Sequence, residues 1–414
     1  MATQRPAPIQ TPLAGVLTIT FLGSLGTGGV TNGVFFLTES AFAWDRTLNY
    51  ALALFMGLIY IAAALAAGPI TRAAGRRNRP ISSRSILMLA LAAIGVSCFL
   101  PSAVAWITGT PRAWTIWVTV GVFSPATGLL WPGVEAYLCG GRRGRSLRHA
   151  IGSFNIVWAS ALVIVFWAMG PLVATKPLWV LAGLGVAHLA SIAALLAFPP
   201  EPGRHLQELD TPHEIDPVRA RKLLVLFRTL MPVSYLVLAT LNPFFPRAAE
   251  DLEIAVDWRT PVVSTWMIAR VGVFALLGGW HGWHGSRAMP AIGWGILIAG
   301  FGATVLAPPL GPGAGVWVFV AGLAAVGAGM SIIYVGSLYY GMEAHDAHVD
   351  AGGAHEALVG AGYTIGPACG LGAVWATSGS PESFEPALLG TIVVICVVMS
   401  LGGVVLSRRA GPRG

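Results

Sequence analysis

One arginine lies in the middle of a long apolar segment, where a charged side chain is unexpected. Arg270 stands in the run WMIARVGVFALLGGW, about halfway along an apolar stretch from Trp258 to Trp280. At about 1.5 Å of rise per residue, it lies roughly 15 to 18 Å from either end of such a helix. An arginine at the centre of a bilayer costs at least about 2.5 kcal/mol and therefore faces a cavity or a partner. Because a guanidinium holds a carboxylate or phosphate through two parallel hydrogen bonds, Arg270 is predicted to bind an anionic group.

Aromatic and amide side chains in other apolar stretches can complete this site. Trp266 lies one helical turn before Arg270 on the same face, and Tyr334 is predicted to be a stacking or hydrogen-bonding neighbour. Further candidates for substrate binding lie at membrane depth, namely Asn32, Trp158, Tyr235 and Tyr363. Such residues either join helices or line a pocket. The structural alternative for Arg270 is a guanidinium satisfied by water and helix carbonyls.

Motifs for enzymatic or ATP-driven chemistry are missing from the sequence. Lys176 and Lys222 are the two lysines, and Pro and Leu follow them, so no phosphate-binding G-x-x-x-x-G-K-[ST] loop exists. The sequence has no H-E-x-x-H pair and no G-x-S-x-G elbow. We therefore expect no enzyme activity, no catalytic residue and no cofactor.

One segment and the four cysteines contain side chains of types that can bind a metal ion. The segment HDAHVDAGGAHE, residues 345–356, offers His, Asp and Glu side chains, but its spacing matches no specific metal site. We interpret it as a solvated loop whose Gly352-Gly353 turn leads into a helix, with Glu356 near the positive amino end of that helix. The cysteines lack C-x-x-C spacing and are predicted to be buried apolar residues. No metal site is predicted.

Composition indicates a membrane as the solvent of the chain. Of 414 residues, 55% are hydrophobic and 10% are charged, whereas soluble domains carry about 25% charged residues. The apolar runs predict twelve transmembrane helices over residues 12–37, 48–71, 84–102, 114–138, 150–173, 178–198, 223–246, 258–280, 288–307, 315–341, 355–379 and 387–407.

The polar segments divide the chain around these helices. We expect a tail over residues 1–11, a six-helix half over 12–198, a linker over 199–222, a second half over 223–407 and a final tail over 408–414. With both termini cytoplasmic, nineteen of the 25 basic residues fall on the cytoplasmic side, as the positive-inside rule requires. The net charge of +7 is explained by anionic lipid at that face, without nucleic acid as a partner. These patterns predict an integral protein of the plasma (inner) membrane.

A repeated loop supports two similar halves. GPITRAAGRR from Gly68 to Arg77 follows the second predicted helix, and GGWHGWHGSR from Gly278 to Arg287 follows the eighth, with Gly, Gly and Arg at the same three places. The first loop resembles the pattern G-x-L-a-D-r-x-G-r-k of the major facilitator superfamily. The fitting positions are Gly68, Ile70, Gly75, Arg76 and Arg77, whereas Arg72 stands at the Asp position.

The resemblance implies two six-helix halves that rock around a central cavity and expose it alternately to each side. The chain is therefore predicted to be a secondary transporter of a small organic solute, driven by an ion gradient. A polytopic membrane sensor or scaffold that moves no solute is the alternative. A midspan arginine favours transport, because a scaffold has little reason to place a charge there.

Gating and proton coupling are predicted from a few charged and small residues. The resemblance implies a role for Gly68, Arg72, Gly75, Arg76 and Arg77 at the cytoplasmic loop. Arg72 is hypothesised to form an inverted latch with Glu135. The alternative is that Arg72 reaches lipid phosphate while Glu135 pairs with Arg142 or Arg143. Because an apolar setting favours the protonated form of a carboxyl group, proton-linked transport through Glu135 is also expected.

Overall fold

The computed structural model describes residues 10–76, 80–142, 144–203, 216–280, 282–343 and 349–409, and these residues contain helices and no strand. In chain order the helices are α1 (Leu13–Gly26), a π-helical segment (Thr27–Asn32), α2 (Val34–Phe42), α3 (Arg46–Gly75), α4 (Ser83–Thr108), α5 (Trp114–Cys139), α6 (Gly144–Thr175), α7 (Pro177–Leu195), α8 (Pro217–Leu241), α9 (Phe245–Asp251), α10 (Val256–Val263), α11 (Thr265–Gly279), α12 (Met289–Val305), a 3-10 turn (Pro308–Leu310), α13 (Gly311–Glu343), α14 (Val349–Ala376), a second 3-10 turn (Pro381–Ser383) and α15 (Phe384–Arg409).

The apolar runs form helices because a helix satisfies every backbone polar group within its own segment, which lipid requires. Ten helical segments in the described part of the chain are long and apolar enough to cross a membrane. Side-chain caps fix several starts. The Asp45 carboxylate accepts the backbone N–H of Leu48 at the start of α3, and the Asp216 carboxylate accepts that of Arg219 at the start of α8. The chain is thus an all-α, polytopic membrane protein.

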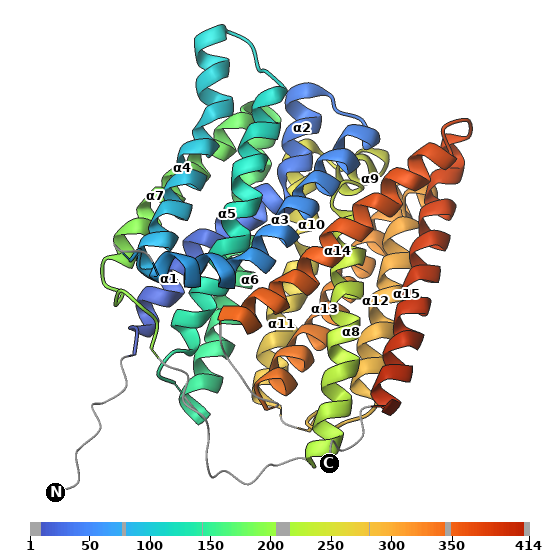
Figure 1. The fold of residues 1–414 in the computed structure, drawn as a ribbon. Helices are drawn as coiled ribbons and strands as arrows, with labels where there is room; N and C mark the ends of the chain where they lie inside the picture. Colours follow the sequence, from blue (N-terminus) through green and yellow to red (C-terminus); the bar gives the residue numbers. More distant parts are fainter. Residues whose placement is uncertain are drawn as a thin grey trace, which may run out of the picture.

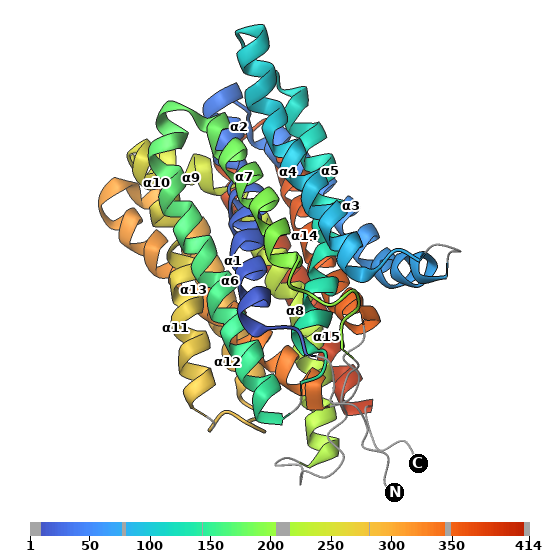
Figure 2. The same cartoon turned by 90° about the vertical axis from the view of Figure 1, so that its left-hand side faces the viewer.

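The helices lie in two groups that face each other (Figure 1). Helices α1 and α4 to α7 gather on the left of this view, and α8, α12, α13 and α15 on the right, while α14 crosses between them. We refer to α1 to α7 as the first group and to α8 to α15 as the second. Figure 2 shows α1, α6 and α7 from the left-hand side. A Cβ on Gly57 of α3 would lie 2.3 Å from the Tyr363 carbonyl oxygen of α14, so these helices touch backbone to backbone.

Several predicted spans differ from the observed helices. The eighth span is broken at Ser264, where α10 gives way to α11, and α10 contains Pro261, which supplies no N–H to the helix. The eleventh span begins earlier than predicted. Gly352 and Gly353 are helical residues of α14, so the interpretation of this segment as a solvated turn is wrong.

The packing of α14 explains why Gly352 and Gly353 are helical. A Cβ on Gly353 would lie 2.9 Å from the Ala64 carbonyl oxygen of α3, and one on Gly352 would lie 3.0 Å from a carboxylate oxygen of Glu135. The two glycines therefore admit a close helix contact and do not form a turn. His345, Asp346 and His348, which were considered as metal ligands, lie outside the described residues.

The first span contains a glycine-rich segment from Gly26 to Gly33. Its middle is π-helical, and the Asn32 side chain donates to the Thr27 carbonyl at 2.9 Å within that wider turn. A Cβ on Gly28 would lie 2.4 Å from Val165, and one on Gly29 would lie 2.5 Å from Leu184. The glycines thus let this segment press against α6 and α7. Single π-helical turns of this kind are frequent at functional sites.

Candidate functional site

A central cavity lies between the two groups of helices. It holds about 690 Å³ of empty space, part of which is open to solvent. All seven side chains predicted for substrate binding line it, namely Asn32, Trp158, Tyr235, Trp266, Arg270, Tyr334 and Tyr363. They come from the π-helical segment and from α6, α8, α11, α13 and α14. The structure therefore gathers residues that are up to 331 positions apart into one place.

Arg270 is fully buried at this cavity. Its exposed fraction is 0%, and none of its three guanidinium nitrogens has a hydrogen-bond partner among the described residues. Its ζ carbon lies 4.7 Å from the centre of the Trp158 ring and 5.3 Å from the ring centres of Phe274 and Tyr334. The rings provide cation–π attraction, but they accept no in-plane N–H hydrogen bond. The guanidinium therefore keeps its hydrogen-bonding capacity for a ligand.

The neighbour of Arg270 on α11 is also left without a partner. Trp266 is 1% exposed, lines the cavity, and its indole N–H has no acceptor among the described residues. A Cβ on Gly327 of α13 would lie 1.8 Å from the Trp266 carbonyl oxygen. Glycine at this position is what allows α11 to bring Trp266 and Arg270 against α13.

An acidic cluster lies at another part of the cavity wall. Glu135 of α5 and Glu356 of α14 both line the cavity. With His355, they offer three ligand atoms that lie within 4.8 Å of one another. The Tyr60 hydroxyl donates a hydrogen bond to the Glu356 carboxylate. Neither carboxylate has an ion-pair partner in the described part of the chain, so the cluster is suited to bind a proton or another cation.

Polar contacts also join the two groups of helices above the cavity. The Asn242 amide at the end of α8 donates to the Asn32 side-chain oxygen at 3.0 Å. The Thr260 hydroxyl of α10 donates to the Phe166 carbonyl of α6 at 2.7 Å, and the Trp167 indole donates to the Ser264 hydroxyl at 3.1 Å. These bonds hold the π-helical segment and α6 against the second group.

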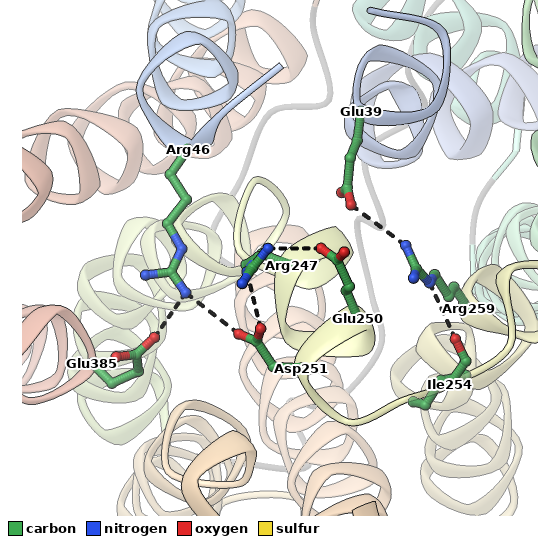
Figure 3. A network of polar contacts seen from close by, with 8 residues as sticks. All are labelled: Glu39, Arg46, Arg247, Glu250, Asp251, Ile254, Arg259 and Glu385. Carbon is green, nitrogen blue, oxygen red and sulfur yellow. Dashed lines mark hydrogen bonds and ion pairs between the residues drawn. The ribbon is translucent and has the colours of Figure 1, made fainter. Parts of the chain in front are cut away.

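Ion pairs close one end of the structure (Figure 3). Arg259 of α10 lies 3.4 Å from the carboxylate of Glu39 on α2. Arg46, at the start of α3, lies 2.9 Å from Glu385 of α15 and 3.8 Å from Asp251 of α9. Each of these three pairs joins the first group of helices to the second. They lie at the end of the bundle opposite to the start of α1 and the finish of α15.

The structure describes all but one of the residues predicted to act in gating. Gly68 and Arg72 lie near the end of α3, which finishes at Gly75, and Arg76 follows it. Arg77 lies outside the described residues. Glu135 lines the cavity beside Glu356, and the Arg72–Glu135 latch stays a prediction.

Arg142, the alternative ion-pair partner of Glu135 in the sequence analysis, makes different contacts in the structure. Arg142 is buried and donates to the carbonyl oxygens of Leu138, Tyr137 and Thr11. It therefore fastens the segment before α1 to the end of α5.

Sequence reasoning missed three residues of the site. Tyr60 lies in the second predicted span and was given no role, and His355 and Glu356 were placed at the amino end of a helix that follows a solvated loop. The available signal was the apolar run that follows Gly353, together with Glu356 as a second acid that could meet Glu135. Only the packing of α14 against α5 reveals that the two acids meet.

The comparisons with known proteins agree on the fold. No family model and no curated protein sequence matches the chain. Among solved structures, it is similar to the nucleoside transporter NupG (11% identity, 94% of this chain and 98% of that chain, TM-score 0.66). It is also similar to a bacterial homologue of the human lysosomal transporter Spinster, in an inward-facing and occupied conformation (15%, 96% and 96%, 0.62). A structure concerning substrate recognition in proton-dependent oligopeptide transporters is similar as well (13%, 96% and 99%, 0.65).

The chain has the major facilitator fold. The resemblance seen in the loop after the second predicted helix is thus confirmed at the level of the whole fold. In this major facilitator fold the cavity lies between the two groups of helices, where a solute-binding site is expected.

Proposed function

We propose that the chain is a secondary transporter that moves a small organic solute by alternating access. In this proposal twelve helices cross the plasma membrane in two six-helix halves, with both termini cytoplasmic. The proposal is supported by the major facilitator fold, by a cavity between the two groups of helices, and by the excess of basic residues on the cytoplasmic side. The observation that carries it is Arg270, fully buried at the cavity with three unbonded nitrogens.

Arg270 binds an anionic group of the solute. A buried guanidinium without an acceptor is costly for the protein, and a carboxylate or phosphate supplies two acceptors in the geometry of its N–H groups. Trp158 and Tyr334 flank the bound group, and the free indole N–H of Trp266 offers one more donor nearby. Asn32, Tyr235 and Tyr363 complete the wall.

The ion pairs of Figure 3 act as the outer gate. They join the two groups of helices at one end of the bundle, and rocking of the halves would have to break them. Because partly exposed pairs of this kind are worth about 1 kcal/mol or less each, the gate can open without a large barrier. The cytoplasmic residues Gly68, Arg72, Gly75, Arg76 and Arg77 act at the opposite end.

Protons are the coupling ion, and Glu135 carries them together with Glu356. The two carboxylates belong to one cluster whose ligand atoms lie within 4.8 Å of one another, and a bound proton removes the repulsion between two ionised carboxylates. The Tyr60 hydroxyl fixes the Glu356 carboxylate in place. Rocking of the halves changes the contact between α5 and α14, and with it the proton affinity of the pair.

Transport is tested in proteoliposomes with an imposed proton gradient and a broad mixture of metabolites, with uptake measured by mass spectrometry. At least one compound bearing a carboxylate or phosphate is expected to accumulate. Arg270→Ala should abolish its uptake, and Arg270→Lys, which keeps the charge but loses the planar fork, should weaken it. Arg287→Ala is the matched control, because Arg287 is exposed and lies outside the cavity.

Two outcomes would contradict the proposal. Full uptake by Arg270→Ala would remove the anion site, and failure of every compound to move under either direction of the gradient would favour a sensor or scaffold. For proton coupling, uptake should acidify the lumen, as a trapped pH dye reports. Uptake that is independent of pH, with a fully active Glu135→Gln variant, would exclude Glu135 as the proton carrier.

A further inference from the structure

The cavity wall carries opposite charges at two separate places. Arg270 supplies the positive charge from α11, and Glu135 and Glu356 supply carboxylates from α5 and α14. Arg270 and these acids form no ion pair with each other in the part of the chain that the structure describes. The two sites are thus kept apart in one cavity.

One aromatic ring borders both sites. The Tyr334 ring centre lies 5.3 Å from the ζ carbon of Arg270 and 5.6 Å from the ring centre of His355. His355 in turn belongs to the cluster with Glu135 and Glu356. The positive site and the acidic cluster therefore both border the Tyr334 ring, close enough for one small molecule to reach both.

Three further tyrosine rings, those of Tyr235, Tyr363 and Tyr60, also line the cavity. The rings of Tyr235 and Tyr363 lie 5.5 Å apart, and those of Tyr363 and Tyr60 lie 6.0 Å apart. Tyr60 then bonds to Glu356. An apolar or aromatic portion of a ligand would pack against these three rings.

Both sites have capacity that the protein leaves unused. At the positive site, three guanidinium nitrogens and the Trp266 indole N–H have no acceptor among the described residues. At the acidic site, the buried Nε2 of His355 has no partner there either. Buried polar atoms normally find a partner, and an exception calls for an explanation such as a ligand.

We propose that the solute is dipolar, with a carboxylate or similar anionic group at Arg270 and an ammonium group at the Glu135–Glu356–His355 cluster. This inference rests on the proposed function and narrows its substrate class. An ammonium has three N–H donors and no acceptor, which suits two carboxylate oxygens and a neutral imidazole nitrogen. The rings of Tyr60 and Tyr363 add cation–π attraction. A solute with two anionic groups would instead place one of them against the carboxylates.

The test compares dipolar probes with their single-charge halves on the full-length protein in detergent. One set is L-phenylalanine with phenethylamine and 3-phenylpropionate, in which the two charges of the amino acid are close together. The other set is 4-(aminomethyl)benzoate with benzylamine and benzoate, in which one ring separates the charges. Binding is measured by intrinsic tryptophan fluorescence and by the shift of the melting temperature.

At least one dipolar probe is expected to bind ten times more tightly than either of its halves, because a second charged contact typically contributes a factor of ten or more. Arg270→Ala should remove binding of the anionic half. Glu135→Gln and Glu356→Gln, made singly and together, should remove the gain that the ammonium provides while leaving anion binding in place. Glu201→Gln is the control acid, because Glu201 is exposed and bonds to Ser83 outside the cavity.

The outcomes separate this inference from the proposed function. If the anionic half binds as tightly as the dipole, the dipolar solute is wrong and anion binding at Arg270 stands. If the amine half binds as tightly as the dipole and its binding does not depend on Arg270, both the dipolar solute and anion binding at Arg270 are wrong. If Zn²⁺ or Mn²⁺ alone binds at the cluster and neither dipolar probe does, the cluster is a metal site. Absence of binding by both dipoles also overturns the inference, while uptake of an anion in proteoliposomes would keep the proposed function.

Discussion

Replacement of Arg270 by methionine should stabilise the unliganded protein while removing its function. The guanidinium is fully buried, and its three nitrogens lack hydrogen-bond partners among the described residues. Each unsatisfied buried polar group costs about 1 to 3 kcal/mol. The three rings between 4.7 and 5.3 Å away return about 1 to 2 kcal/mol each.

These ranges overlap, but an unpartnered buried charge costs more than a neutral polar group, and this makes the balance unfavourable for arginine in the empty cavity. Exchange of a buried charge for an apolar side chain of similar volume stabilises proteins by about 1 to 4 kcal/mol in favourable cases, and Arg270→Met should fall in this range. The assay is the melting temperature of the purified protein in detergent, followed by intrinsic fluorescence without added ligand. The variant should melt at a higher temperature than the wild type.

The same variant should lose its response to ligand. Because a ligand that binds only the folded state raises the melting temperature, an anionic compound should stabilise the wild type and leave Arg270→Met unchanged. Arg259→Met is the matched control. It removes one partner of an ion pair with Glu39 and should lower the melting temperature. If Arg270→Met instead lowered the melting temperature as Arg259→Met does, the guanidinium would be structurally satisfied, and the reasoning from unbonded nitrogens would be wrong.

Two further predictions follow from contacts between helices. Arg259→Glu should open the outer gate and reduce uptake, and the added change Glu39→Arg should restore it; if the double variant stays as impaired as the single one, the pair is not part of the gate. Gly327→Ala should destabilise the protein by about 1 to 3 kcal/mol, since its Cβ would lie 1.8 Å from the Trp266 carbonyl oxygen. Gly152→Ala, which meets open space, should stabilise it by up to about 1 kcal/mol, and equal melting temperatures for the two alanine variants would refute the predicted close approach at Gly327.

The sequence by itself predicted the membrane as the solvent of the chain and Arg270 as the residue on which the proposed binding site rests. A lipid environment demands long apolar helices that satisfy their own backbone, so composition and run length were enough to predict an all-α membrane protein. Arg270 stood out because a charge in the middle of an apolar run is costly wherever the other helices lie. Trp266 followed from helical periodicity, because residues four apart share a face.

Tertiary structure alone decided what Arg270 contacts and where the acidic cluster lies. Glu135 and Glu356 are 221 positions apart, and the ion pair of Arg46 with Glu385 spans 339, so no local pattern could join them. Glu356 was placed at the amino end of a helix beside a solvated turn, because a Gly-Gly pair is typical of a turn in water. In this structure the same glycines remove the Cβ atoms that would keep α14 away from α3 and α5. The acidic cluster exists because two helix backbones approach closely, which is a property of packing between distant segments.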